Sequence, residues 1–155
     1  MRGRTITIIP THIEMVTEER AEEVRELLAR VRSWAARRHD IVAVGLAGSW
    51  AHGDARMDSD VDIILLTTEE RDYLDGEKWV RDLGGLRIIN TERWGPMTER
   101  RFVLPSGLEV EMGIAPPSWA DIDPVDYGTQ RGVEDGFSII HDPEGLLIRL
   151  VEACS

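Results

Sequence analysis

Two aspartates separated by one residue are the first side chains in this sequence that could do chemistry together. Asp60 and Asp62 enclose Val61 and open an apolar, β-prone run that continues to Leu66. Side chains alternate between the two faces of a strand, so both carboxylates point the same way while Val61 and Ile63 face the core. Two carboxylates this close repel each other unless a cation lies between them, and Mg²⁺ favours such oxygen ligands. The pattern predicts a metal site, although a solvated, Asp-rich strand start has the same sequence.

A Gly-Ser pair ends eleven residues before Asp60. Gly48 and Ser49 follow a compact β-prone run, Ile41 to Ala47, and we expect them to open a short helix. The N-terminus of a helix offers unpaired N–H groups and the positive end of a dipole, which both attract phosphate. Gly48 lets the phosphate approach the backbone closely, and the Ser49 hydroxyl adds a donor. The spacing matches neither the Walker nor the dinucleotide-binding loop, and alone the pair is more typical of a plain turn.

Together the two features resemble the signature of the nucleotidyltransferase superfamily, whose members have the polymerase β-like fold. The resemblance rests on Gly48-Ser49 followed by Asp60-Val61-Asp62-Ile63, and it is most specific over residues 45–66. Three intervening residues are also similar to those of small prokaryotic members: Gly53, Arg56 and Ser59. The fold class that this implies is α/β or α+β, with a mixed β-sheet and packed helices. We expect residues 1–155 to form a single nucleotidyltransferase domain.

The resemblance also assigns roles to the residues of the motif. It implies that Gly48, Ser49 and Ser59 bind the nucleotide, an NTP for which ATP is the expected choice. It further implies that Asp60 and Asp62 are catalytic and hold two Mg²⁺ ions. In such a two-metal site the ions clamp the attacking and leaving oxygens of an in-line displacement.

The family also requires a third carboxylate on a neighbouring strand. The run Leu108 to Ile114 supplies two candidates, because its apolar residues share one face and Glu109 and Glu111 share the other. We favour Glu111 as the third catalytic and metal-binding residue, since it lies deeper in the strand and precedes Gly113, where there is space for a ligand. Glu109 is the alternative.

The implied reaction moves a nucleoside monophosphate from an NTP to an acceptor hydroxyl, with Glu111 as a candidate to deprotonate the acceptor. The resemblance leaves three classes of acceptor open: a small molecule, a protein side chain or an RNA end. The alternative function is that of an antitoxin-type minimal nucleotidyltransferase that binds, and could AMPylate, a small helical partner protein. Acceptor recognition would come from loops at residues 91–100 and 115–136, from a second copy of the chain, or from a partner chain.

The residues around the motif predict the elements that position it. Thr17 can cap a long helix in which apolar residues recur at spacings of three and four as far as Ala35. Strands are expected at 41–47, 61–66, 86–90, 101–104, 108–114 and 137–140. Shorter helices are expected at 50–55, at 76–83 and from Asp142 onward, and irregular structure is expected between residues 115 and 136.

The charge and the composition of the chain limit the classes of partner that we expect it to bind. The chain has 155 residues and a formal charge of −11, and residues 41–155 hold 22 of its 29 acidic groups against 10 basic ones. Such a surface repels a phosphate backbone, so duplex nucleic acid is disfavoured as a partner, whereas a cationic acceptor would be attracted. No run of eighteen apolar residues and no signal-type N-terminus occur, and Cys154 is the single cysteine. We therefore expect a cytoplasmic protein without a membrane partner.

Overall fold

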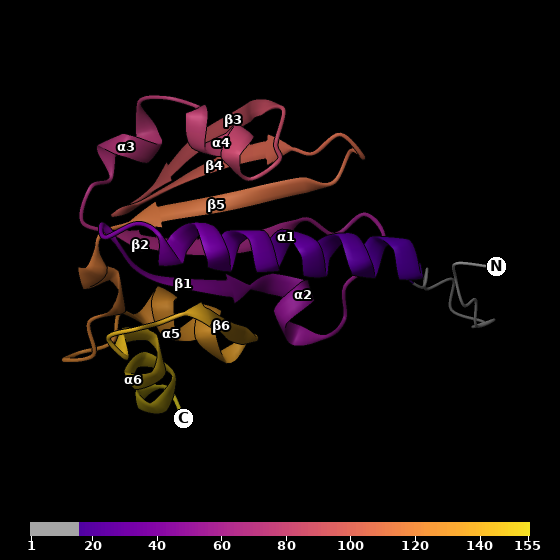
Figure 1. The fold of residues 1–155 in the computed structure, drawn as a ribbon. Helices are drawn as coiled ribbons and strands as arrows, with labels where there is room; N and C mark the ends of the chain where they lie inside the picture. Colours follow the sequence, from indigo (N-terminus) through magenta and orange to yellow (C-terminus); the bar gives the residue numbers. More distant parts are fainter. Residues whose placement is uncertain (1–15) are drawn as a thin grey trace.

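The computed structural model describes residues 16–155 as one six-stranded mixed sheet with helices on both faces (Figure 1). The strands lie in the order β3-β4-β5-β2-β1-β6. Their bounds are β1 Ile41–Ala47, β2 Val61–Thr67, β3 Arg87–Trp94, β4 Met97–Val103, β5 Glu109–Ala115 and β6 Phe137–His141. Only the central pair, β2 with β5, is parallel; the other neighbours are antiparallel. The mixed α+β class predicted from the sequence is confirmed.

The helices divide between the two faces of this sheet. Their bounds are α1 Glu18–Ala36, α2 Gly48–His52, α3 Arg71–Leu74, α4 Lys78–Asp82, the 3-10 helix η1 Pro117–Ala120, α5 Tyr127–Glu134 and α6 Leu146–Ala153. Side chains of α1, α3 and α4 join one buried cluster, and side chains of η1, α5 and α6 join another. In Figure 1 the long α1 crosses the first face, and α5 and α6 lie together with β6.

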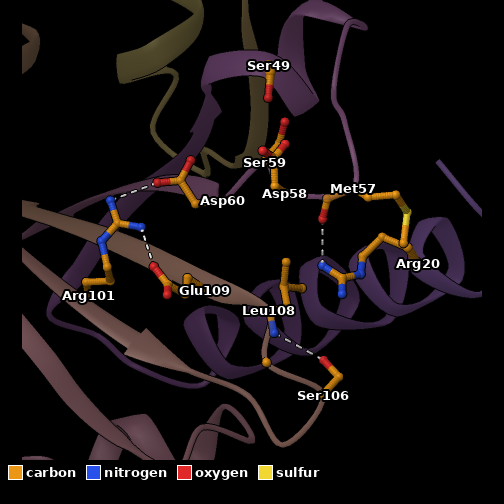
Figure 2. A pocket seen from close by; sticks show the side chains of 11 residues that line it. Arg20, Ser49, Met57, Asp58, Ser59, Asp60, Arg101, Ser106, Leu108 and Glu109 are labelled. Carbon is orange, nitrogen blue, oxygen red and sulfur yellow. Dashed lines mark hydrogen bonds and ion pairs between the residues drawn. The ribbon is translucent and has the colours of Figure 1, made fainter. Parts of the chain in front are cut away.

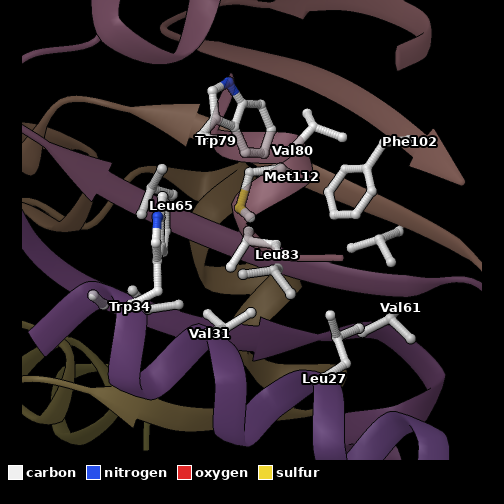
Figure 3. Close-up of a cluster of buried hydrophobic side chains, with 14 of the residues drawn as sticks. Leu27, Val31, Trp34, Val61, Leu65, Trp79, Val80, Leu83, Phe102 and Met112 are labelled. Atoms are coloured by element: carbon white, nitrogen blue, oxygen red, sulfur yellow. The ribbon is translucent and has the colours of Figure 1, made fainter. Parts of the chain in front are cut away.

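The larger cluster packs α1 on the centre of the sheet (Figure 3). Leu27 and Val31 of α1 are fully buried against the sheet, as are Val61 and Leu65 of β2. Complete burial of such a side chain contributes about 1.5–3 kcal/mol of hydrophobic free energy. Thr17 caps α1, since its side-chain oxygen accepts a hydrogen bond from the backbone N–H of Arg20 at 3.1 Å. The predicted helix and its apolar stripe are confirmed.

The opposite face of the sheet is apolar at one end and polar at the other. Where β2 and β5 end, Leu66 and Ala115 are buried under Leu147 and Leu150 of α6. Where the same two strands begin, this face carries acidic side chains, and no cluster of apolar residues from the described range 16–155 covers them. The starts of β2 and β5 are therefore the open end of this face.

Two predicted helices have different bounds in the structure. The short helix expected at 50–55 begins at Gly48 and ends at His52, because Gly53 takes a left-handed conformation with φ 94°. The last helix begins at Leu146 rather than after Asp142. Asp142 still stabilises it, since its carboxylate accepts hydrogen bonds from the N–H groups of Leu147 and Ile148 at 3.0 and 2.9 Å.

The two segments expected to be loops are largely ordered elements, so that expectation is wrong. Residues 91–100 continue β3 to Trp94 and start β4 at Met97, because a tight turn at Gly95 lets these strands pair to their ends. Residues 115–136 contain η1 and α5, and the Asp126 carboxylate caps α5 by accepting from the N–H of Thr129 at 3.1 Å. The helix expected at 76–83 is α4, Lys78–Asp82, and the preceding α3, Arg71–Leu74, was not expected from the sequence.

Among residues 16–155, no helix is both long enough and apolar enough to cross a membrane. Residues 1–15, for which the sequence predicts no signal peptide, lie outside the described part of the chain.

Candidate active site

Three carboxylates converge where β2 and β5 begin. Asp62 lies directly opposite Glu111 in the parallel pairing of these strands, and Asp60 immediately precedes β2. One oxygen from each of the three side chains lies within 4.8 Å of the others. Val61 and Ile63, which alternate with the aspartates, are fully buried on the other face. The structure thus brings together the three residues that the sequence predicts as metal ligands.

Arg101 faces these carboxylates with a positive charge. It lies on β4 directly opposite Glu111, and its Nη2 is 2.7 Å from Glu111 Oε1 and 2.9 Å from Asp60 Oδ2. Its Nη1 donates a hydrogen bond to Glu109 Oε1 at 3.0 Å. Burial alone would lower the pKa of Arg101, but Glu111 and Asp60 hold this pKa above its ordinary value. Glu109 therefore takes part in the ion-pair network but does not belong to the converging group.

Asp62 carries the negative charge that Arg101 does not compensate. Burial first, and then repulsion from Asp60 and Glu111, raises the pKa of Asp62 from 3.8 to about 7, while Arg101 partly offsets the rise. A carboxyl group that resists ionisation in this way gains most from a cation that binds beside it.

The three-carboxylate group fits a divalent metal. It offers hard oxygen donors from Asp60, Asp62 and Glu111. The guanidinium group of Arg101 does not neutralise all of their negative charge. Mg²⁺ is usually held by one or two carboxylates together with substrate phosphates. The donor set is therefore compatible with Mg²⁺, as the sequence predicts.

The Gly-Ser turn lies beside Asp62 because β1 and β2 are antiparallel neighbours. Ala47, the last residue of β1, pairs with Asp62, and α2 begins at the next residue. Gly48 has a φ of 74°, and a Cβ added to it would collide with the Asp62 carboxylate. Glycine is required here both by the left-handed backbone and by the close approach of the aspartate.

A cavity of about 530 Å³ opens next to the carboxylates (Figure 2). Three of its lining residues belong to the predicted site: Ser49, Ser59 and Asp60. Two arginines also line it, Arg20 from α1 and Arg101 from β4. The cavity therefore offers hydroxyl and guanidinium groups, which can bind phosphate, beside three carboxylates, Asp58, Asp60 and Glu109.

Sequence reasoning missed Arg20, Arg101 and Glu99 as residues near the site. Glu99 and Arg101 lie on β4 on the same face as Glu111, and the strand was expected to start too late to show their alternation. Burial first, and then Glu111, raises the pKa of Glu99. Arg20 occupies the polar side of α1, where the sequence offers no signal that separates it from a solvated helix residue.

The chain belongs to the streptomycin adenylyltransferase family, whose sequence profile matches residues 21–103. This places it in the nucleotidyltransferase superfamily, as the resemblance implies. No curated protein matches the sequence significantly.

Two solved structures show the same fold at low sequence identity, and a third is similar over part of the chain. Cid1 in complex with the UTP analog UMPNPP has a TM-score of 0.53 at 14% identity, over 81% of this chain and 36% of that chain. The polymerase core of TRAMP, an RNA surveillance complex, has a TM-score of 0.50 at 14% identity, over 64% and 32%. An aminoglycoside 6-adenyltransferase from Bacillus subtilis has a TM-score of 0.47 at 14% identity, over 64% and 36%. The aligned region spans about a third of the length of each of these proteins.

Proposed function

We propose that this protein is a Mg²⁺-dependent nucleotidyltransferase that moves a nucleoside monophosphate from an NTP to an acceptor hydroxyl. ATP is the NTP that we expect. The observation that carries the proposal is the convergence of Asp60, Asp62 and Glu111 beside the Gly-Ser turn and a hydroxyl-lined cavity. The family match supports the same reaction class. The excess negative charge of the three carboxylates is consistent with a substrate whose phosphates bind together with a metal ion.

Each residue of the site has a role in this proposal. Asp60, Asp62 and Glu111 would hold two Mg²⁺ ions, which when bound supply electrophilic stabilisation of charge on the phosphoryl oxygens. Ser49 and Ser59 line the cavity and would donate hydrogen bonds to phosphate oxygens, and Gly48 keeps the turn close to Asp62. Arg20 and Arg101 would balance the charge of the triphosphate.

The reaction itself is a displacement at the α-phosphorus. The acceptor oxygen forms a bond to this phosphorus while the bond to the oxygen that bridges to the β-phosphate breaks. Pyrophosphate leaves with the bonding electrons, and the Glu111 carboxylate takes the proton of the acceptor hydroxyl. Positioning by this preformed site and electrostatic stabilisation would account for most of the rate.

We also propose that the protein acts in the cytoplasm, which its single cysteine supports. The alternative function, neutralisation of a small helical partner protein, has no support in residues 16–155, and we do not propose it. The described part of the chain likewise gives no observation that favours a second copy in the site.

The test is substitution of the two aspartates. Asp60→Asn and Asp62→Asn should each abolish Mg²⁺-dependent pyrophosphate release from ATP and the thermal stabilisation that Mg²⁺ with ATP gives the wild type. Asp121→Asn, on an exposed segment outside the cavity, is the matched control and should behave as the wild type. Near-normal pyrophosphate release by both aspartate variants would overturn the proposed reaction.

A further inference from the structure

A second cavity, of about 480 Å³, lies outside the nucleotide site, on the face of the sheet that carries Asp62 and Glu111. The β3–β4 hairpin forms one wall, and the segment that contains η1 and α5 forms the other. The lining residues that matter here are Trp94, Met97, Glu99, Trp119, Asp126 and Thr129. None of its lining residues lines the cavity beside Ser49 and Ser59.

We propose that this second cavity binds the acceptor, and that the acceptor is an aromatic molecule with a positive charge and a hydroxyl group. The inference rests on the proposed function, because only a transferase requires an acceptor. It adds to that function the place where the acceptor binds and its chemical class.

The position of the cavity suits an acceptor. Along β5, Glu109 lines the first cavity, Glu111 belongs to the carboxylate group, and Gly113 pairs with Glu99 of the second cavity. The two cavities thus lie on opposite sides of Glu111. Glu99 and Glu111 are diagonal neighbours across the β4–β5 pair and their side chains interact, so a ligand that contacts Glu99 lies beside the three-carboxylate group. An in-line displacement requires the acceptor and the leaving group on opposite sides of the reacting phosphorus.

The walls of the cavity favour an aromatic ring. Trp94 leaves 59% of its surface exposed although it borders a cavity, and Trp119 opposite is half-buried. Met97 forms an apolar floor between the two walls. Indole faces and a thioether stack well against an aromatic ring and attract a cation.

The polar groups of the cavity favour a positive charge on the ligand. Asp126 caps α5, and its Oδ2 accepts from the N–H of Thr129 at 3.1 Å and from the Thr129 hydroxyl at 3.3 Å. Asp126 is held in the cap of α5 but keeps its charge, and Glu99 lies close to Glu111 and Trp94, so a ligand cation would meet two carboxylates in this cavity. Glu99 is the one of the two that lies beside the three-carboxylate group, and it would pair with the cation. A ligand with many amino and hydroxyl groups would leave most of them without a partner between two indoles, at a cost for each.

The test uses three probes of equal size and different charge: tyramine, 2-(4-hydroxyphenyl)ethanol and 4-hydroxyphenylacetate. Binding is followed by NMR of the indole N–H signals of the five tryptophans, without NTP or metal. Tyramine should shift the signals of Trp94 and Trp119 saturably and leave those of Trp34 and Trp79, buried in the cluster on the other face, unchanged. The neutral and anionic probes should bind at least about tenfold more weakly, because they lack the charge-assisted bond to Glu99.

Variants separate the two parts of the cavity. Trp94→Ala should weaken tyramine binding at least about tenfold, whereas Trp94→Phe, which keeps an aromatic face, should retain it. Glu99→Gln should remove the preference for the charged probe, and Asp121→Asn should change nothing. Thermal melting of each variant shows that it is folded. Equal binding of the three probes, or unchanged binding by folded Trp94→Ala, would overturn the proposal.

Two further ligands test the assignment itself. Glucosamine that binds as tightly as tyramine would overturn the aromatic class, and adenosine that shifts the same signals more strongly would make the cavity a nucleobase site. Failure of the proposed function is distinguishable, because Asp60→Asn should abolish transfer of AMP to tyramine and leave tyramine binding intact. Tyramine that binds without AMP transfer by the wild type would refute the acceptor role of the cavity.

Discussion

At the scale of single residues, the candidate site is dominated by uncompensated negative charge. Three carboxylates lie beside one guanidinium group. Burial and the repulsion among these carboxylates raise the pKa of Asp62 to about 7. A folded state that contains such a group is less stable when the group is ionised, because the unfolded chain separates the charges.

Asp62→Asn should therefore raise the melting temperature of the metal-free protein. In the unfolded chain Asp62 titrates near 3.8, and in the folded protein near 7, so the wild type loses stability as the pH rises between these values. The gain from the substitution should be small near pH 4 and largest near pH 8, about 1–2 kcal/mol once solvent screening is allowed for. Melting curves with EDTA across this pH range measure it.

Mg²⁺ provides the complementary measurement for the same variant. It should stabilise the wild type by mass action on the folded state and stabilise Asp62→Asn much less. Asp121→Asn should match the wild type in both measurements. Equal melting of wild type and Asp62→Asn at every pH, with equal gains from Mg²⁺, would contradict a convergent carboxylate site.

The two glutamates of β5 should differ in importance. Glu111 lies in the converging group, whereas Glu109 pairs with Arg101 at its margin. We expect Glu111→Gln to lose at least about a hundredfold in pyrophosphate release, within the usual range for a proton-transfer residue, and Glu109→Gln to lose far less. Rates at saturating ATP and Mg²⁺ compare them directly. A larger loss for Glu109→Gln would mean that the third carboxylate was assigned wrongly.

At the scale of elements, the turn between β1 and α2 joins the phosphate-binding residues to the metal ligands. Gly48 and Gly53 both have positive φ values, 74° and 94°, but only a Cβ at Gly48 would meet a neighbour, the Asp62 carboxylate. These two glycines flank the same short helix and differ in that single respect.

Gly48→Ala and Gly53→Ala should share one effect and differ in another. Each places a side chain in the left-handed region, which costs about 1–2 kcal/mol of stability. Only Gly48→Ala also displaces Asp62, so only this variant should lose Mg²⁺-dependent binding of ATP. Thermal melting and isothermal titration with Mg²⁺ and ATP separate the two effects. Loss of binding in both variants would show that the conformation of α2, and not its distance from Asp62, is what matters.

At the scale of the whole molecule, one sheet carries both buried clusters. The clusters lie on opposite faces and share the strands β1, β2, β4 and β5. Neither cluster is complete without these strands, so we propose that the described residues unfold as a single domain.

Two probes on opposite faces should therefore report the same transition. In a variant with Trp94 and Trp119 replaced by Phe, tryptophan fluorescence senses the first cluster through Trp34 and Trp79. The reactivity of Cys154, which packs against the second cluster, senses the opening of α6. We expect coincident midpoints in urea. Exposure of the thiol at a clearly lower urea concentration would show that α6 and its neighbours form a separate unit.

The sequence by itself determined the elements that rest on local periodicity. The 3.6-residue period of α1, the apolar run of β1 and the alternation in β2 and β5 are visible in the chain. The alternation also shows the shared face of Asp60 and Asp62 and that of Glu109 and Glu111. The Gly-Ser turn was also recognisable, although the exact start of α2 was not. Such features depend on neighbours two to four residues away, which any sequence displays.

The tertiary structure alone decided what meets across the sheet. It placed Arg101 opposite Glu111 and brought Arg20 to the cavity beside Ser49 and Ser59. It also turned residues 91–100 and 115–136 from expected loops into the two walls of a second cavity. These contacts depend on the strand order β3-β4-β5-β2 and on its register. Strand order follows from how helices and strands cover one another's apolar faces, which is a balance over the whole chain and leaves no local pattern in the sequence.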